Sequence, residues 1–207
     1  MLIQIHPDNP QERLVKQVAE ILKSGGIAIF PTDSVYAMGC SLLQHKAVER
    51  IARIKGIKVE KANFSILTND LSHLSEYTKP LNNHLFRLMK KVLPGPYTFI
   101  LPANNNVPKI FESRKKNIGI RVPDNSVIQA IISELGCPLV STSLHSDDDD
   151  YLEYVVNAEL IYEKYENLVD LVIDGGIGGV EPSTVLDCTG DEIEIVREGK
   201  GPVDFLQ

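Results

Sequence analysis

The sequence predicts a single-domain α/β protein with a mixed parallel and antiparallel sheet flanked by helices, and three observations support this. Short apolar strand-like runs alternate in part with segments of helical period. The length of 207 residues and the 43% hydrophobic content suit one globular domain. No repeat of fixed period and no low-complexity linker divides the chain. We therefore expect residues 1–207 to form one domain.

Nine segments are predicted as strands because they are short, rich in β-branched or other apolar residues, and bounded by turn-forming residues. These segments are 2–5, 27–32, 63–68, 97–101, 117–123, 138–144, 168–176, 183–189 and 193–199.

Five segments are predicted as helices because apolar residues recur on one helical face. The first, 9–26, has Leu14, Val18 and Leu22 on that face, Pro10 near its start, and the pair Gly25-Gly26 at its end. The others are 45–54, 81–93, 126–136 and 157–165.

Charge is distributed unevenly along the chain. The net charge is −7, yet residues 46–121 hold 15 of the 21 Lys and Arg residues and only 5 of the 28 Asp and Glu residues. Such a region can attract a polyanion although the whole molecule is acidic. The alternative is that these charges lie on ordinary solvated helix faces.

Polar side chains follow several predicted strands, where α/β proteins usually bind ligands. Thr32 and Thr68 end the second and third predicted strands, after the apolar runs "IAIF" and "NFSIL", and Ser141 to Ser143 follow "PLV" in the strand that begins at 138. Arg121 lies between Ile120 and Val122, and burying it requires an anionic partner. That partner is a ligand carboxylate or phosphate, or else an internal carboxylate.

The sequence lacks the motifs of several other functional classes. No phosphate-loop or dinucleotide fingerprint occurs, and the five histidines lack zinc-site spacing. Asp147 to Asp150 lack the glycine-spaced ligand positions of a Mg²⁺ or Ca²⁺ loop, so no metal site is predicted. These four residues are predicted to form a solvated loop. Three scattered cysteines, no signal sequence and no apolar run of about 20 residues indicate a reduced, cytoplasmic protein that does not enter a membrane.

Seven motifs resemble those of the YrdC/YciO family, in the order in which that family has them. They are "FPTDSVYAMGC", "RIKGI", "LPGPYTFIL", "IGIRVP", "PLVSTSL", "PSTVLD" and "VREG", and they cover residues from about 10 to 200. The resemblance implies a YrdC-like domain with a twisted sheet. It also implies synthesis of L-threonylcarbamoyladenylate from L-threonine, bicarbonate and ATP, with Mg²⁺ on the phosphates, for tRNA modification.

The resemblance assigns roles to individual residues. Threonine would be held by Thr32, Thr68, Arg121, Ser141 and Ser183, and ATP by Lys55, Asn117, Ser143 and Arg197. The catalytic residues would be Lys55, Arg121 and Ser143, and Lys61 is expected to line the same site.

Three departures from the synthase pattern place the chain nearer the YciO branch. Ile57 replaces an arginine, His145 replaces an asparagine, and Asp147 to Asp150 replace a polar or basic loop. Two alternatives to the synthase therefore stay open. One is a protein that binds nucleotide or double-stranded RNA through residues 46–121 without this catalysis, and the other is an enzyme with a related phosphorylated substrate.

Overall fold

The computed structural model describes residues 1–59, 62, 64–107, 116–144 and 156–206. Ten strands form one sheet, in the order β1-β8-β2-β3-β7-β4-β6-β5-β9-β10. They are β1 (Leu2–Gln4), β2 (Ala28–Phe30), β3 (Ala37–Ser41), β4 (Ser65–Leu67), β5 (Tyr97–Pro102), β6 (Asn117–Arg121), β7 (Leu139–Ser143), β8 (Leu171–Asp174), β9 (Thr184–Asp187) and β10 (Glu194–Arg197). The pairings are both parallel and antiparallel, so the predicted single-domain α/β fold with a mixed sheet is confirmed.

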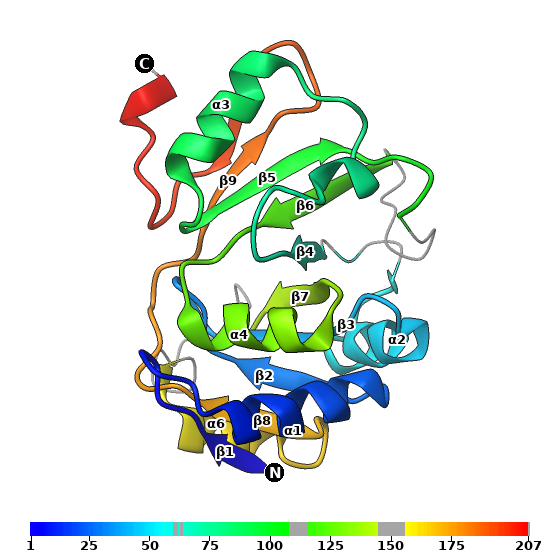
Figure 1. Cartoon of the computed structure of the whole chain (residues 1–207), viewed down its shortest axis with the longest axis vertical. Coiled ribbons are helices and arrows are strands. Elements are labelled where there is room, and N and C mark those ends of the chain that lie inside the picture. The colour runs from blue at the N-terminus through cyan, green and yellow to red at the C-terminus, as the bar shows by residue number, and fades with distance from the viewer. Residues whose placement is uncertain (60–61, 63, 108–115, 145–155, 207) are drawn as a thin grey trace.

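Helices pack on both faces of this sheet. The α-helices are α1 (Glu12–Lys23), α2 (His45–Ile54), α3 (Asn83–Val92), α4 (Ser126–Leu135) and α6 (Ala158–Tyr165), and short 3₁₀ turns lie at η2 (Leu74–Glu76) and η4 (Asp204–Leu206). In Figure 1, α1 and α4 lie before the lower strands and α3 lies across the upper ones. All nine predicted strands and all five predicted helices are present, and β3 is an additional strand that the sequence did not predict.

Two apolar cores follow from the alternation of side chains along the strands. One core joins α2, α3 and α6 to strand residues such as Ile66, Phe99 and Ile120. The other joins α1 and α4 to residues such as Phe30, Leu67 and others on the opposite face. Among the described residues, no helix is long and apolar enough to cross a bilayer.

The three cysteines differ in accessibility. Cys40 and Cys188 are buried, and burial raises the pKa of each thiol to about 12, whereas Cys137 is partly exposed. Because the thiolate is the reactive form, we expect one thiol to react readily with Ellman's reagent at pH 8 and three to react in denaturant. In a Cys137→Ser variant the readily reacting thiol should disappear; two or three fast thiols in the folded parent would contradict the buried positions.

Candidate functional site

A strip of small residues crosses the middle of the sheet. Ser141 on β7 lies opposite both Gly39 on β3 and Ser65 on β4, and Ser65 lies opposite Gly119 on β6. A Cβ atom on Gly119 would lie 2.8 Å from Ser65 Oγ and 3.3 Å from Thr98 Cγ2, so these side chains share one face. The strip continues the face that α1 and α4 cover elsewhere, and the Phe30 ring packs closely on Gly39, where a Cβ would lie 3.0 Å from it.

Arg121, at the end of β6, is the buried cation beside this strip. Its Nη2 lies 3.0 Å from Asp33 Oδ1 and donates to Ser34 Oγ at 3.0 Å, and both ionic side chains are only 7% exposed. Asp33 is thus the internal carboxylate that the sequence left open as an alternative. Burial lowers the pKa of Arg121, the Asp33 carboxylate opposes this effect, and the positive charge of Arg197 lowers the pKa further.

One nitrogen of Arg121 has no hydrogen-bond partner in the described part of the chain. Its Nε is buried and makes no hydrogen bond with any described residue. An unsatisfied buried donor costs about 1–3 kcal/mol. The ion pair with Asp33 therefore satisfies part of the guanidinium and leaves one buried N–H without an acceptor among the described residues.

Thr32 lies in the same neighbourhood as Arg121. Its Oγ1 donates to the carbonyl of Val35 at 2.7 Å and lies 3.1 Å from Ser34 Oγ, the hydroxyl that accepts from Arg121. The loop after β2 is held closely by its neighbours, because a Cβ on Gly179 would lie 2.1 Å from the Ser34 carbonyl oxygen. Thr32 and Arg121, which the sequence assigns to one site, are therefore connected through a single serine.

A second hydroxyl pair lies between β5 and β9. The Oγ atoms of Ser183 and Thr98 are 2.9 Å apart, and both residues are buried. Arg197, at the end of β10, donates from Nε and Nη2 to the Ser183 carbonyl at 3.1 and 2.9 Å. The positive charge of Arg197 also lowers the pKa of Arg121, so this second cation adds positive charge near the Arg121–Asp33 ion pair.

Lys55 and Ser143 form a further contact near the end of α2. Lys55 Nζ donates to the Ser143 carbonyl at 3.1 Å. Gly56 has a φ of +67° and Ile57 N donates to the Ala52 carbonyl at 3.0 Å, which is a common way to end a helix. Ile57 is 40% exposed in this turn, so it brings an apolar surface where the synthase pattern has a cation.

The remaining predicted residues take separate positions. Thr68 donates its N–H to the Arg121 carbonyl at 3.0 Å and its hydroxyl to the Asp70 carbonyl at 2.9 Å. Asn117 begins β6 opposite Pro102, four residues before Arg121. Lys61, His145 and Asp147 to Asp150 lie outside the described residues.

Sequence reasoning missed three residues of this site. Asp33 contacts Arg121 and Thr98 contacts Ser183, whereas Lys200 reaches the site through Asp33, to whose carbonyl its Nζ donates at 2.5 Å. The place of Asp33 beside Thr32 in a polar loop was the only hint in the sequence that it belongs to the site. Its partner, Arg121, is 88 residues away along the chain.

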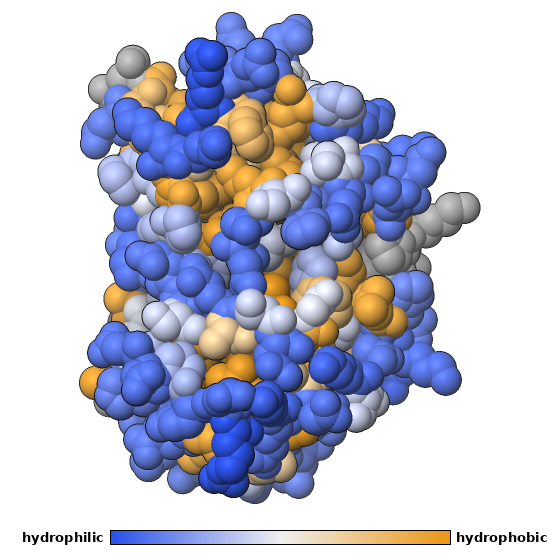
Figure 2. Space-filling view, viewed as in Figure 1, coloured by the Kyte–Doolittle hydropathy of each residue, from blue (hydrophilic) through white to orange (hydrophobic). Residues whose placement is uncertain are grey.

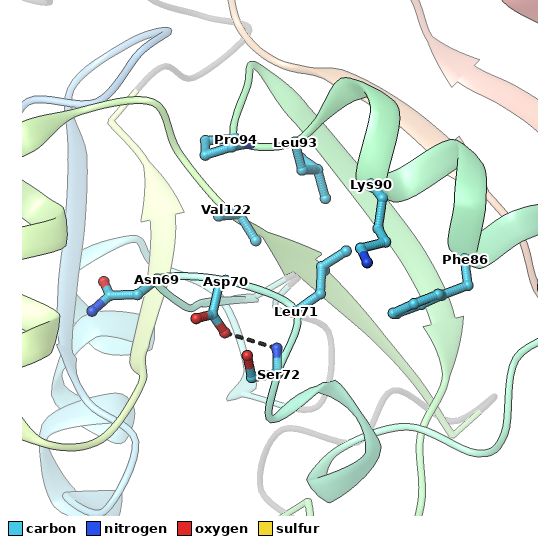
Figure 3. A pocket seen from close by; sticks show the side chains of 9 residues that line it. All are labelled: Asn69, Asp70, Leu71, Ser72, Phe86, Lys90, Leu93, Pro94 and Val122. Atoms are coloured by element: carbon cyan, nitrogen blue, oxygen red, sulfur yellow. Dashed lines mark hydrogen bonds between the residues drawn. The ribbon is translucent and has the colours of Figure 1, made fainter.

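A hollow of about 280 Å³ opens beyond the ends of β4 and β6. Its lining comprises Asn69, Asp70, Leu71, Ser72, Phe86, Lys90, Leu93, Pro94 and Val122, and Figure 3 shows α3 with its following turn on one wall and the 69–72 loop on another. Lys90 Nζ lies 5.6 Å from the centre of the Phe86 ring. In the same orientation as Figure 1, Figure 2 shows hydrophobic surface in the upper half, framed by hydrophilic residues.

No group of three or more His, Cys, Asp or Glu residues that could hold a metal ion occurs in the described parts of the chain. The cations and hydroxyls of the site suit an anionic organic ligand.

The Sua5/YciO/YrdC family model, described as "Telomere recombination", matches residues 20–199. The chain belongs to this family. The family membership expected from the seven motifs is thereby confirmed.

Three relatives illustrate the breadth of the Sua5/YciO/YrdC family. YciO of Escherichia coli strain K12 is 45% identical over 200 residues, which are 96% of this chain and 95% of YciO. Its crystal structure superposes with a TM-score of 0.92 at 43% identity, covering 100% of this chain and 99% of that one. A threonylcarbamoyl-AMP synthase of Chromobacterium violaceum is 31% identical over 188 residues, 90% of this chain and 95% of the synthase.

The third relative is P. abyssi Sua5 in a crystal structure with L-threonine. It matches with a TM-score of 0.87 at 24% identity, covering 96% of this chain and 57% of Sua5, and it supports the likeness of fold alone.

Proposed function

We propose that the chain binds L-threonine and ATP on this face of the sheet and forms L-threonylcarbamoyladenylate from them and bicarbonate. The observation that carries the proposal is the buried guanidinium of Arg121, whose Nε has no partner among the described residues. The 31% identity to a threonylcarbamoyl-AMP synthase, over 90% of this chain, supports the class of reaction and, by its name, a threonine substrate.

Threonine would bind on the Arg121 side of the strip. Its carboxylate would accept from the Nε of Arg121, which is a charge-assisted hydrogen bond. Its hydroxyl and ammonium groups would meet the buried hydroxyls of Thr32, Ser141 and Ser183, with Thr68 at the end of β4 completing this subsite. The hydroxyls both donate and accept, so they suit a ligand that carries both kinds of group.

ATP would bind towards Lys55, Ser143, Asn117 and Arg197. Lys55 contacts the Ser143 carbonyl and Arg197 contacts the Ser183 carbonyl, so each cation is already directed by the backbone. Mg²⁺ would accompany the nucleotide and bind phosphate oxygens and water.

The reaction needs positioning and charge stabilisation more than an acid or a base. The ammonium group of threonine first loses a proton to solvent, and the free amine and bicarbonate then give a carbamate with loss of water. A carbamate oxygen then attacks the α-phosphorus of ATP. The new O–P bond forms as the bond to the β-phosphate oxygen breaks and pyrophosphate leaves. Lys55 and Arg197 would stabilise the charge that develops on the transferred adenylyl group.

A second candidate is binding of nucleotide or RNA without synthesis, and Ile57 is the observation that favours it. Its exposed apolar side chain supplies no fork for a phosphate at this turn. Polyanion binding would use cations of residues 46–121, including the exposed Lys90, Lys91 and Lys116. Arg114 and Lys115 belong to the same set of cations but lie outside the described residues. Charge reversal at these five positions would flatten the salt dependence of such binding.

Calorimetric titration of L-threonine and of its methyl ester tests the proposal. The ester keeps the hydroxyl and amine but loses the carboxylate charge, so we expect it to bind about 10-fold to 100-fold more weakly. Equal affinities would exclude Arg121 as the carboxylate partner. Absence of binding of either ligand, with retained nucleotide binding, would favour the second candidate.

A further inference from the structure

The carboxylate of Asp33 joins two segments that are distant in sequence. Its Oδ1 lies 3.0 Å from Arg121 Nη2, and its Oδ2 accepts from the backbone N–H of Asp124 at 3.0 Å. Asp33 lies in the loop after β2, whereas Arg121 ends β6 and Asp124 precedes α4. Both acceptor oxygens of Asp33 are therefore engaged by the chain that leaves β6.

This engagement fixes the direction of the Arg121 guanidinium. The guanidinium is planar and rigid, so holding Nη2 between Asp33 and Ser34 also determines where Nε points. Nε remains buried and without a partner among the described residues. Asp33 thus holds Nη2, and the adjacent Nε is the donor that is left over.

Lys200 connects the same loop to the C-terminal segment. Its Nζ donates to the Asp33 carbonyl at 2.5 Å, and its backbone N–H donates to the Pro182 carbonyl at 2.9 Å. Gly199 permits this path, because a Cβ there would lie 2.3 Å from the Pro182 carbonyl oxygen. Lys200 therefore links the segment that carries Arg197 to the loop that holds Arg121.

We propose that Asp33 is the positioning residue that orients Arg121 for an amino-acid carboxylate, and that Lys200 holds Asp33 in place from the C-terminal segment. The proposal deepens the function proposed above and rests on it for the identity of the ligand. Asp33 does not contact the ligand in this account; it acts through Arg121.

The substitution Asp33→Asn tests the orienting role with little change in shape. An asparagine side chain has one acceptor oxygen and an NH2 group, so it cannot accept from Arg121 Nη2 and Asp124 N–H on separate oxygens as Asp33 does. Lys200→Met removes the ammonium group from an exposed side chain. Asp124→Asn is the matched control, because it removes a neighbouring exposed carboxylate and keeps the backbone N–H that Asp33 binds.

Two readouts separate this inference from the proposed function. The first is the rate of hydrogen exchange at Arg121 Nε, followed by NMR on the full-length protein without ligand. We expect exchange about 10-fold faster in Asp33→Asn, a smaller increase in Lys200→Met, and the parent rate in Asp124→Asn. The second is calorimetry, in which L-threonine affinity falls about 10-fold in Asp33→Asn and ATP affinity stays within about twofold.

Each outcome decides one question. Parent-like exchange at Arg121 Nε in both Asp33→Asn and Lys200→Met would overturn the positioning role, whatever the ligand does. Faster exchange with no L-threonine binding even by the parent would uphold the positioning role and reject the proposed ligand. Should Asp33→Asn fail to fold, Lys200→Met carries the test, because faster exchange there supports the proposal and unchanged exchange contradicts it.

Discussion

Replacing Arg121 by methionine is expected to lower the free energy of unfolding by about 3–5 kcal/mol. Methionine fills much of the same volume but leaves the Asp33 carboxylate, whose side chain is 7% exposed, without its cation. A buried charge that loses its partner keeps its desolvation penalty and loses the compensating attraction. Denaturant unfolding followed by circular dichroism measures the change.

The double variant Asp33→Asn/Arg121→Met is the control for this interpretation. It removes both charges, so its stability should lie above that expected from adding the two single effects, by about 1 kcal/mol or more. Strict additivity of the two substitutions would show that the ion pair does not couple the two segments energetically.

Introducing arginine at Ile57 is expected to tighten ATP binding about 10-fold to 100-fold, which corresponds to one charged hydrogen bond of about 1.5–3 kcal/mol. Ile57 is 40% exposed and follows Lys55, whose ammonium contacts the Ser143 carbonyl. The helix-ending bond at this turn uses the backbone N–H of Ile57, so the substitution retains it. Calorimetry at fixed Mg²⁺ measures the affinity.

Leu43→Arg provides the matched control, because Leu43 is 71% exposed and precedes α2, whereas Ile57 follows it. It adds the same charge at the other end of the same helix and should leave ATP affinity within about twofold, since exposed charges are screened over about 10 Å. Equal gains from both variants would mean that total charge, rather than a contact at the turn after α2, controls nucleotide binding.

The periodicity of the sequence predicted most of the fold, and β3 shows where such reasoning fails. The strand "AMGCS" has no β-branched residue and no alternation of polar and apolar residues, because all five positions are buried between β2 and β7. Its strand conformation comes from pairing on both sides rather than from local propensity.

The sequence drew attention to the cations and hydroxyls of the candidate site, but it did not predict the hydrogen bonds and the ion pair that connect them. Thr32 and Arg121 are recognisable because they interrupt or follow apolar strands. The contact of Asp33 with Arg121 spans 88 residues and that of Lys200 with Asp33 spans 167, so neither has a local signal. The sequence analysis also did not predict the hollow beside α3. Its lining residues, such as Leu71 and Phe86, resemble ordinary half-buried core residues in the sequence.

The measurement that tests the central claim most directly is an assay of the purified protein with ATP, L-threonine, bicarbonate and Mg²⁺, analysed by chromatography and mass spectrometry. The account predicts L-threonylcarbamoyladenylate and pyrophosphate in equal amounts, with product lost when L-threonine or bicarbonate is omitted and when Arg121→Met replaces the parent. Unchanged ATP after prolonged incubation, in protein that calorimetry shows to bind neither L-threonine nor ATP, would contradict it.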